Sequence, residues 1–120
     1  MLAPVFEKGL NLPNHIPTIM NIQNKVIGDS YEMLISGRVD GEGANRLEEE
    51  ILKAIQAGAK SIYVNLNSAT FLCSAGLRVL LQYWRQMKQK QSLLLATRPS
   101  PEVEAVLAAS GFREALVEKV

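Results

Sequence analysis

The stretch SIYVNLNSATFLCSAGLR, residues 61–78, decides the fold because it contains the clearest passage from strand to helix in the chain. Residues 61–66 are a short apolar run that predicts a buried strand. The seven residues after them are expected to form a polar loop. Ser74 then opens the strongest helical pattern, and we expect it to be the N-cap because serine hydroxyls accept from free backbone N–H groups. The face predicted to point inward carries Leu77, Leu80, Leu81 and Trp84.

Upstream of this stretch, the pattern predicts a hairpin and a helix. Residues 19–27 and 31–36 carry apolar side chains typical of strands, and the Gly28-Asp29 pair between them is a signal for a tight antiparallel turn. The glycines Gly41 and Gly43 are expected to belong to a flexible loop. An amphipathic helix ending near Gly58 follows, with an inward stripe of Ala44, Leu47, Ile51 and Ile55.

Downstream, residues 92–97 predict a further strand and residues 101–110 a short helix that Gly111 caps. Phe112 is expected to pack back onto the core. The resulting order is strand, strand, helix, strand, helix, strand, helix. Such alternation predicts the α/β class, with the later strands parallel because each helix returns the chain to the same edge of the sheet.

The first residues differ from the rest. Residues 1–17 contain prolines, a glycine and asparagines without periodicity, so we interpret them as an extended N-terminal arm and residues 18–120 as one domain. The arm is expected to pack either on its own domain or on a neighbouring subunit, and the second alternative would produce a homodimer.

Composition excludes several classes of protein. A chain of 120 residues has the length of one domain, and 48% hydrophobic with 21% charged residues is ordinary for a soluble protein. Thirteen basic and twelve acidic side chains leave a net charge of +1, which argues against nucleic-acid binding. No apolar run is long enough to insert in a membrane. The single cysteine and the lack of a readable secretory signal favour a cytoplasmic location.

The chemistry of a known enzyme class is missing. His15 is the only histidine, so no metal site is expected, and neither phosphate-loop pattern occurs. No cofactor is implied. A small enzyme using Cys73 as a nucleophile beside His15 is an alternative, but a small buried thiol is the favoured interpretation because no activating base is evident.

Ser74 stands out because it opens a helix. Free N–H groups and the positive end of the helix dipole favour an anion there. A phosphoryl group on its hydroxyl would add about −1.5 to −2 charges at the centre of any interface formed by that surface. Ser74 is therefore either the position of a phosphorylation switch or simply a helix cap.

The segment resembles the signature of the STAS family, the domain shared by sulphate transporters and bacterial anti-sigma factor antagonists. In that family an Asp-Leu-Ser-like strand end leads to Asp-Ser-Ser-Gly-Leu at a helix start. The counterparts here are Asn65-Leu66-Asn67 and Cys73-Ser74-Ala75-Gly76-Leu77, with Gly37-Arg38-Val39-Asp40 upstream and Ser100-Pro101-Glu102-Val103 downstream. The resemblance covers about residues 18–117. It implies a mixed sheet of four to five strands, an antiparallel N-terminal hairpin and about three helices packed on the sheet.

The resemblance also implies a function. Stand-alone antagonists of this family bind an anti-sigma factor that is also a serine protein kinase; phosphorylation of the serine releases them, and a phosphatase restores binding. By this resemblance Ser74 would be the phosphoacceptor, and the protein would not be an enzyme. The residues that would contact the partner are Asp40, Asn67, Cys73, Ser74, Ala75 and Gly76.

Two positions depart from the family pattern. Asn65 and Cys73 replace carboxylates that the family usually shows near the serine. This favours the alternative of a constitutive scaffold, or a subunit of a transport or signalling complex, that works without phosphorylation. Arg38 and Arg78 either contact a phosphate or lie on solvated faces, and the second interpretation is favoured.

Overall fold

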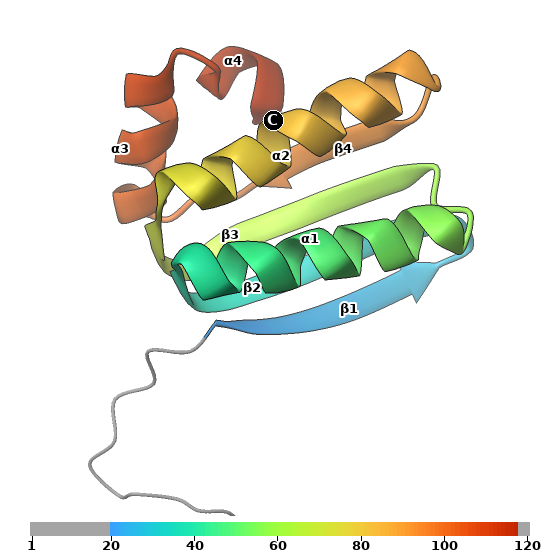
Figure 1. The fold of residues 1–120 in the computed structure, drawn as a ribbon, viewed down its shortest axis with the longest axis horizontal. Coiled ribbons are helices and arrows are strands. Elements are labelled where there is room, and N and C mark those ends of the chain that lie inside the picture. The colour runs from blue at the N-terminus through green and yellow to red at the C-terminus, as the bar shows by residue number, and fades with distance from the viewer. Residues whose placement is uncertain (1–19, 118–120) are drawn as a thin grey trace, which may run out of the picture.

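The computed structural model describes residues 20–117, which form one four-stranded sheet and four helices (Figure 1). The predicted arm, residues 1–17, lies outside the described residues. The elements in chain order are β1 (Asn21–Ile27), β2 (Ser30–Val39), α1 (Gly41–Gln56), β3 (Ser61–Leu72), α2 (Ser74–Gln89), β4 (Leu93–Thr97), α3 (Pro101–Ser110) and α4 (Arg113–Leu116).

The sheet has the strand order β1-β2-β3-β4, so every strand neighbours the next one along the chain. β1 and β2 are antiparallel and meet at Gly28, whose φ of +61° is a left-handed conformation that glycine adopts without strain. β2, β3 and β4 are parallel, with α1 and α2 as the crossover helices. The predicted α/β class, antiparallel hairpin and later parallel strands are therefore confirmed.

The prediction for β3 was wrong about its end. The strand continues to Leu72, through the residues expected to form a loop. Beyond the end of β4 it still pairs with β2, where Ala69 aligns with Gly37 and Leu72 with Val39. Ala69 is buried between the exposed Ser68 and Thr70, and Leu72 is buried next to the partly buried Phe71. The mixed composition that suggested a loop therefore belongs to a half-exposed strand.

The inward face predicted for the second helix was also wrong. Of the four residues expected inward, only Leu80 is fully buried, whereas Leu77, Leu81 and Trp84 are partly buried at the margin of the core. The face turned to the core carries Gly76, Val79, Leu80, Tyr83 and Met87. The shift of about one residue around the helix leaves apolar side chains of α2 accessible to solvent.

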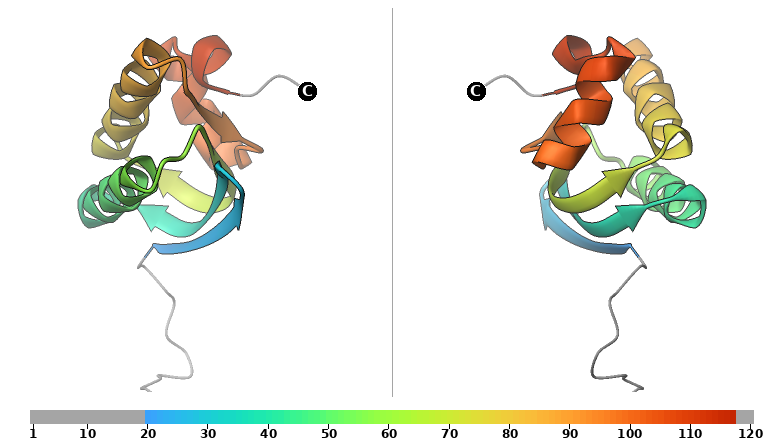
Figure 2. Two further views of the ribbon diagram at one scale, coloured as in Figure 1. Left: turned by 90° about the vertical axis from the view of Figure 1, so that its right-hand side faces the viewer. Right: turned by 90° about the vertical axis from the view of Figure 1, so that its left-hand side faces the viewer.

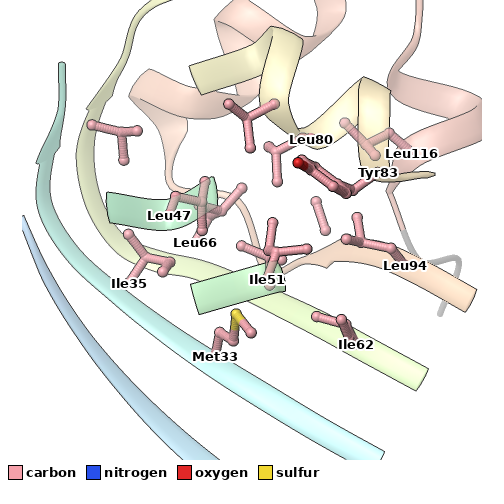
Figure 3. Close-up of a cluster of buried hydrophobic side chains, with 14 of the residues drawn as sticks. Met33, Ile35, Leu47, Ile51, Ile62, Leu66, Leu80, Tyr83, Leu94 and Leu116 are labelled. Atoms are coloured by element: carbon pink, nitrogen blue, oxygen red, sulfur yellow. The ribbon is translucent and has the colours of Figure 1, made fainter. Parts of the chain in front are cut away.

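The core lies between the sheet and the two long helices. α1 and α2 lie on the same side of the sheet (Figure 2), and their side chains meet those of β2, β3 and β4 (Figure 3). Burying each leucine or isoleucine contributes about 1.5–3 kcal/mol. The largest fully buried side chains are those of Met33, Ile35, Val39, Leu47, Ile51, Ile62, Leu66, Leu80, Met87, Leu94, Leu107 and Leu116.

The C-terminal part agrees with prediction up to Gly111. α3 spans the predicted residues, with Ser100 as its N-cap and Gly111 at φ +83° as its left-handed C-cap. Phe112 was expected to pack back onto the core, but its side chain is 36% exposed. Leu116 of the short α4, which was not predicted, is buried instead.

Candidate functional site

The candidate site forms where β2 and β3 end side by side. Val39 and Leu72 are register partners in the parallel pair, and the Cys73 amide donates a 2.9 Å hydrogen bond to the Val39 carbonyl. The next residue after each strand begins a turn into a helix, α1 after Asp40 and α2 after Cys73. The structure therefore brings Asp40 and the start of α2 together, as predicted, although they are more than thirty positions apart in the sequence.

Both helices are capped by the residue that directly follows the strand. Asp40 is extended at φ −91°, and its Oδ1 accepts from the Gly43 amide at 2.9 Å. Cys73 has the same role in α2, where its Sγ accepts from the Gly76 amide at 3.4 Å. Ser74 is therefore the first helical residue and not the N-cap, which corrects the prediction. Gly43 lies inside the first turn of α1, as Gly41 does, so the expected flexible loop is helix.

Glycine at position 76 allows the start of α2 to press against the strand ends. A Cβ atom built there would lie 2.8 Å from both Val39 Cγ1 and Leu72 Cδ1, which is too close for any side chain. Gly76 is itself buried, so it lies beneath the predicted partner surface. Ala75 is partly buried beside it.

Ser74 is exposed, and its hydroxyl forms no hydrogen bond with any of residues 20–117. It lies at the N-terminal end of α2, next to the N-terminal end of α1 (Figure 1). The first backbone N–H groups of a helix have no partner within the helix, and its dipole is positive at that end. The hydroxyl is thus both accessible and in an environment that stabilises an added negative charge.

Ser74 also stands at the rim of a hollow along α2, which we call the α2 groove, with a volume of about 500 Å³. The groove exists because Leu77 and Leu81 are only partly buried. Two arginines belong to the same lining, so the groove combines apolar surface with positive charge. Its lining consists of Ser74, Leu77, Arg78, Leu81, Gln82 and Arg85.

The sequence interpretation missed the α2 groove. Leu77 and Leu81 were placed in the core, whereas the structure leaves both only partly buried. The available signal was the spacing itself, because residues 74, 77, 78, 81, 82 and 85 follow the i, i+3, i+4 rule and share one face of a helix. Arg38 and Arg78 are both exposed, in agreement with the favoured interpretation of solvated faces, and the Arg38 guanidinium stacks 4.1 Å above the Phe71 ring.

Asn67 is separated from the other predicted partner residues. It is exposed on β3, six residues before Cys73, which is up to about 20 Å along an extended strand. Asn65, which stands where the family usually has a carboxylate, lies two residues before Asn67. It aligns with Leu34 of β2, whereas Leu72 at the end of β3 aligns with Val39. The side-chain amide of Asn65 donates a hydrogen bond to Glu32 Oε2 at 3.1 Å. The Asn65 side chain is therefore held at the middle of the sheet and is not next to Ser74.

The described residues contain neither a candidate metal site nor a candidate membrane-spanning helix. Within residues 20–117, no three His, Cys, Asp or Glu side chains are grouped so that they could hold a metal ion. In the same range no helix has the length and apolar character needed to span a membrane. His15, which the alternative of a small enzyme pairs with the Cys73 thiol, lies outside the described residues.

Comparison of the sequence with known proteins finds relatives among the anti-sigma factor antagonists. A putative anti-sigma factor antagonist, BtrV of Bordetella bronchiseptica, is 32% identical over 78 residues, which cover 65% of this chain and 67% of the relative. The anti-sigma-B factor antagonist of Staphylococcus aureus is 24% identical over 95 residues, which cover 79% of this chain and 88% of the relative.

Solved structures share the fold. The anti-sigma factor antagonist SpoIIAA in its unphosphorylated form superimposes with a TM-score of 0.72 at 22% identity, covering 83% of this chain and 89% of that chain. SpoIIAA of Bacillus in the phosphorylated form gives 0.66 at 20% identity, covering 83% and 92%. The STAS domain model matches residues 21–119, nearly the whole described structure. On this match, together with the sheet order and the paired helix starts, the chain belongs to the STAS domain family.

Proposed function

We propose that this protein is an anti-sigma factor antagonist: it binds a serine-kinase anti-sigma factor, and phosphorylation of Ser74 ends that binding. The observation that carries the proposal is the position of the Ser74 hydroxyl, which is exposed, has no partner among residues 20–117 and opens α2 beside the α2 groove. The names of the relatives support the same role, as does the existence of phosphorylated and unphosphorylated forms of a protein with this fold.

The surface that would meet the partner consists of the paired helix starts and the α2 groove. Asp40 contributes a partly buried carboxylate, and Arg78 with Arg85 contributes positive charge around the exposed parts of Leu77 and Leu81. Apolar surface together with charge is typical of an interface, because the first gives affinity and the second gives orientation. Asn67 would contact only a partner large enough to extend along β3.

In the phosphorylation step, the partner kinase supplies ATP and the catalytic groups, and this chain supplies only the nucleophile. The Ser74 oxygen forms a bond to the γ-phosphorus of ATP, the bond between that phosphorus and the β–γ bridging oxygen breaks, and the hydroxyl proton passes to a base of the kinase. Hydrolysis by a phosphatase restores the hydroxyl. In this scheme the chain itself has no catalytic role. Phosphorylation takes place in the cytoplasm, where ATP is available.

Phosphorylation acts on the interface through charge. A dianion at the first residue of α2 is favoured within the folded domain, since it faces free N–H groups and stands four residues before Arg78. The partner, however, would have to remove water from this dianion in order to bind. The domain therefore remains folded after phosphorylation while the complex is weakened.

Calorimetry of binding to a kinase-type anti-sigma factor from the organism that makes this protein tests the proposal. Ser74→Ala is expected to bind as the original chain does, and Ser74→Glu to bind at least about tenfold more weakly, or about 1.4 kcal/mol. Gln89→Glu, with the same added charge at the other end of α2, should leave the affinity unchanged. Equal binding of all three variants would favour a constitutive scaffold, and failure of the original chain to bind would reject the proposed partner.

A further inference from the structure

A second hollow lies on the side of the sheet opposite to α1 and α2, and we call it the sheet pocket. Its volume is about 350 Å³, within the range of small-molecule sites. No residue of the described helices lines it. Its lining includes Lys25, Ile27, Glu32, Tyr63, Thr97 and Arg98.

Strand register explains why these side chains gather. Lys25, Glu32 and Tyr63 are neighbours across β1, β2 and β3, so they form one row over three strands. The residues next to them along the chain, Met33 and Ile62, are fully buried in the core. Because side chains alternate between the two faces of a strand, the row must point away from the core. α1 and α2 both lie on the core side of the sheet (Figure 2), so the row faces the opposite side.

Thr97 gives the strongest sign that the pocket takes a ligand. It ends β4, is only 8% exposed, and its Oγ1 is buried without a hydrogen-bond partner. No other side-chain nitrogen or oxygen within residues 20–117 is in that condition. A buried hydroxyl without a partner is unfavourable, because it has lost its hydrogen bonds to water and gained none in return. A ligand in the sheet pocket would supply the missing bond.

The charges around Thr97 indicate what kind of ligand. Lys25 and Arg98 both line the pocket, and neither forms an ion pair or hydrogen bond with another of the described residues. The one carboxylate there, that of Glu32, already accepts from Asn65 at 3.1 Å. Arg98 has a φ of +48°, a left-handed conformation that is strained for a residue with a side chain and is often found at functional positions.

We propose that the sheet pocket binds a small organic anion. Lys25 and Arg98 would hold the anionic group, the Thr97 hydroxyl would hydrogen-bond to it, and Ile27 and Tyr63 would contact the apolar part of the ligand. None of these residues belongs to the surface around Ser74 or to the α2 groove. The site is therefore independent of the proposed contact with an anti-sigma factor, and its test is independent too.

Titration of the ¹⁵N-labelled full-length chain with benzoate, followed by NMR, tests this proposal. Benzoate carries one carboxylate on an apolar ring, and inorganic phosphate serves as an anion without an apolar part. We expect saturable shifts of the Tyr63, Thr97 and Arg98 amides with benzoate, and weaker binding of phosphate. The absence of saturable shifts with both probes, or shifts confined to residues outside the pocket, would overturn the proposal.

Two variants separate binding from folding. Arg98→Ala is expected to weaken benzoate binding about tenfold or more, because a hydrogen bond to a charged group is lost, whereas the exposed Lys90→Ala should leave binding unchanged. Thr97→Val removes the hydroxyl and keeps the shape, so it should raise the melting temperature of the free protein and weaken benzoate binding. A Thr97→Val protein that binds benzoate as tightly as the original chain would contradict the assignment.

Discussion

The amide of Cys73 donates to the carbonyl of Val39 at 2.9 Å, and this hydrogen bond extends the parallel pairing of β2 and β3 to the ends of both strands. Because each strand leads directly into a helix, the alignment also sets the starts of α1 and α2 next to each other. Asp40 and Ser74 come to the same surface for this reason. The geometry of the candidate site thus follows from the register of β2 with β3.

The close approach of α2 to β2 can be tested at position 76. Gly76→Ala would place a Cβ atom 2.8 Å from Val39 Cγ1, so the helix start must shift, and we expect a loss of about 1–3 kcal/mol in the free energy of unfolding. Urea denaturation measures this. Gly41→Ala is the matched control, because a Cβ there meets nothing within 4 Å. Equal effects of the two substitutions would contradict the close packing.

Two substitutions of Asp40 separate the stability that its helix cap contributes from the effect of its charge. Asp40→Ala removes the acceptor of the Gly43 amide and is expected to lower the free energy of unfolding by about 1 kcal/mol. Asp40→Asn keeps an acceptor and removes the charge, so it should retain most of the stability. If the neutral asparagine variant is as unstable as the alanine variant, the side chain does not act as a cap.

Tyr83 links α2 to α1 and should make stability depend on pH in the alkaline range. Its hydroxyl donates to Glu48 Oε2 at 2.7 Å, and burial together with this carboxylate raises the pKa of Tyr83 to about 12 from 10.0. Between these values the unfolded chain releases the proton and the folded chain keeps it. Stability contributed by Tyr83 is therefore complete below pH 10 and is lost as the pH rises towards 12.

Denaturation of the original chain and of Tyr83→Phe at a series of pH values measures this contribution. The phenylalanine variant should lose about 1 kcal/mol at neutral pH, the value of one hydrogen bond. It should also show a shallower fall in stability above pH 10. Parallel curves for the two proteins over the alkaline range would show that Tyr83 does not titrate as described.

A negative charge at position 74 should affect folding and binding in opposite directions. Ser74→Glu places a carboxylate at the positive end of α2 and is expected to raise the free energy of unfolding by about 0.3–1 kcal/mol. Gln89→Glu puts the same charge at the negative end and should lower it. Thermal unfolding at low ionic strength measures both changes. A destabilised Ser74→Glu protein would mean that loss of binding reflects poor folding.

The sequence was sufficient to predict the order of elements as far as α3, since the hairpin at Gly28 and the α3 caps are local signals. It was insufficient wherever tertiary contacts decide the outcome. β3 runs to Leu72 because β2 remains beside it, a pairing that no local pattern reveals. The face of α2 is set by contact of Gly76 with Val39, and hydrophobicity alone places Leu77 and Leu81 in the core.

The same distinction applies to the candidate site. Ser74 was found from its position at a helix start, which is a local feature. The α2 groove was not found, because it depends on which leucines are left half-exposed. The sheet pocket was not found either: its residues come from all four strands and from Arg98 after the last one, and only the register brings them together.

The central claim is that Ser74 is the phosphoacceptor of a binding switch. Its most direct test is the intact mass of this protein after incubation with ATP and a kinase-type anti-sigma factor from the same organism, followed by fragment mapping. We predict one phosphoryl group, located on Ser74, and no mass change for Ser74→Ala. A complex that forms while the protein stays unmodified, or equal labelling of Ser74→Ala, would contradict the claim.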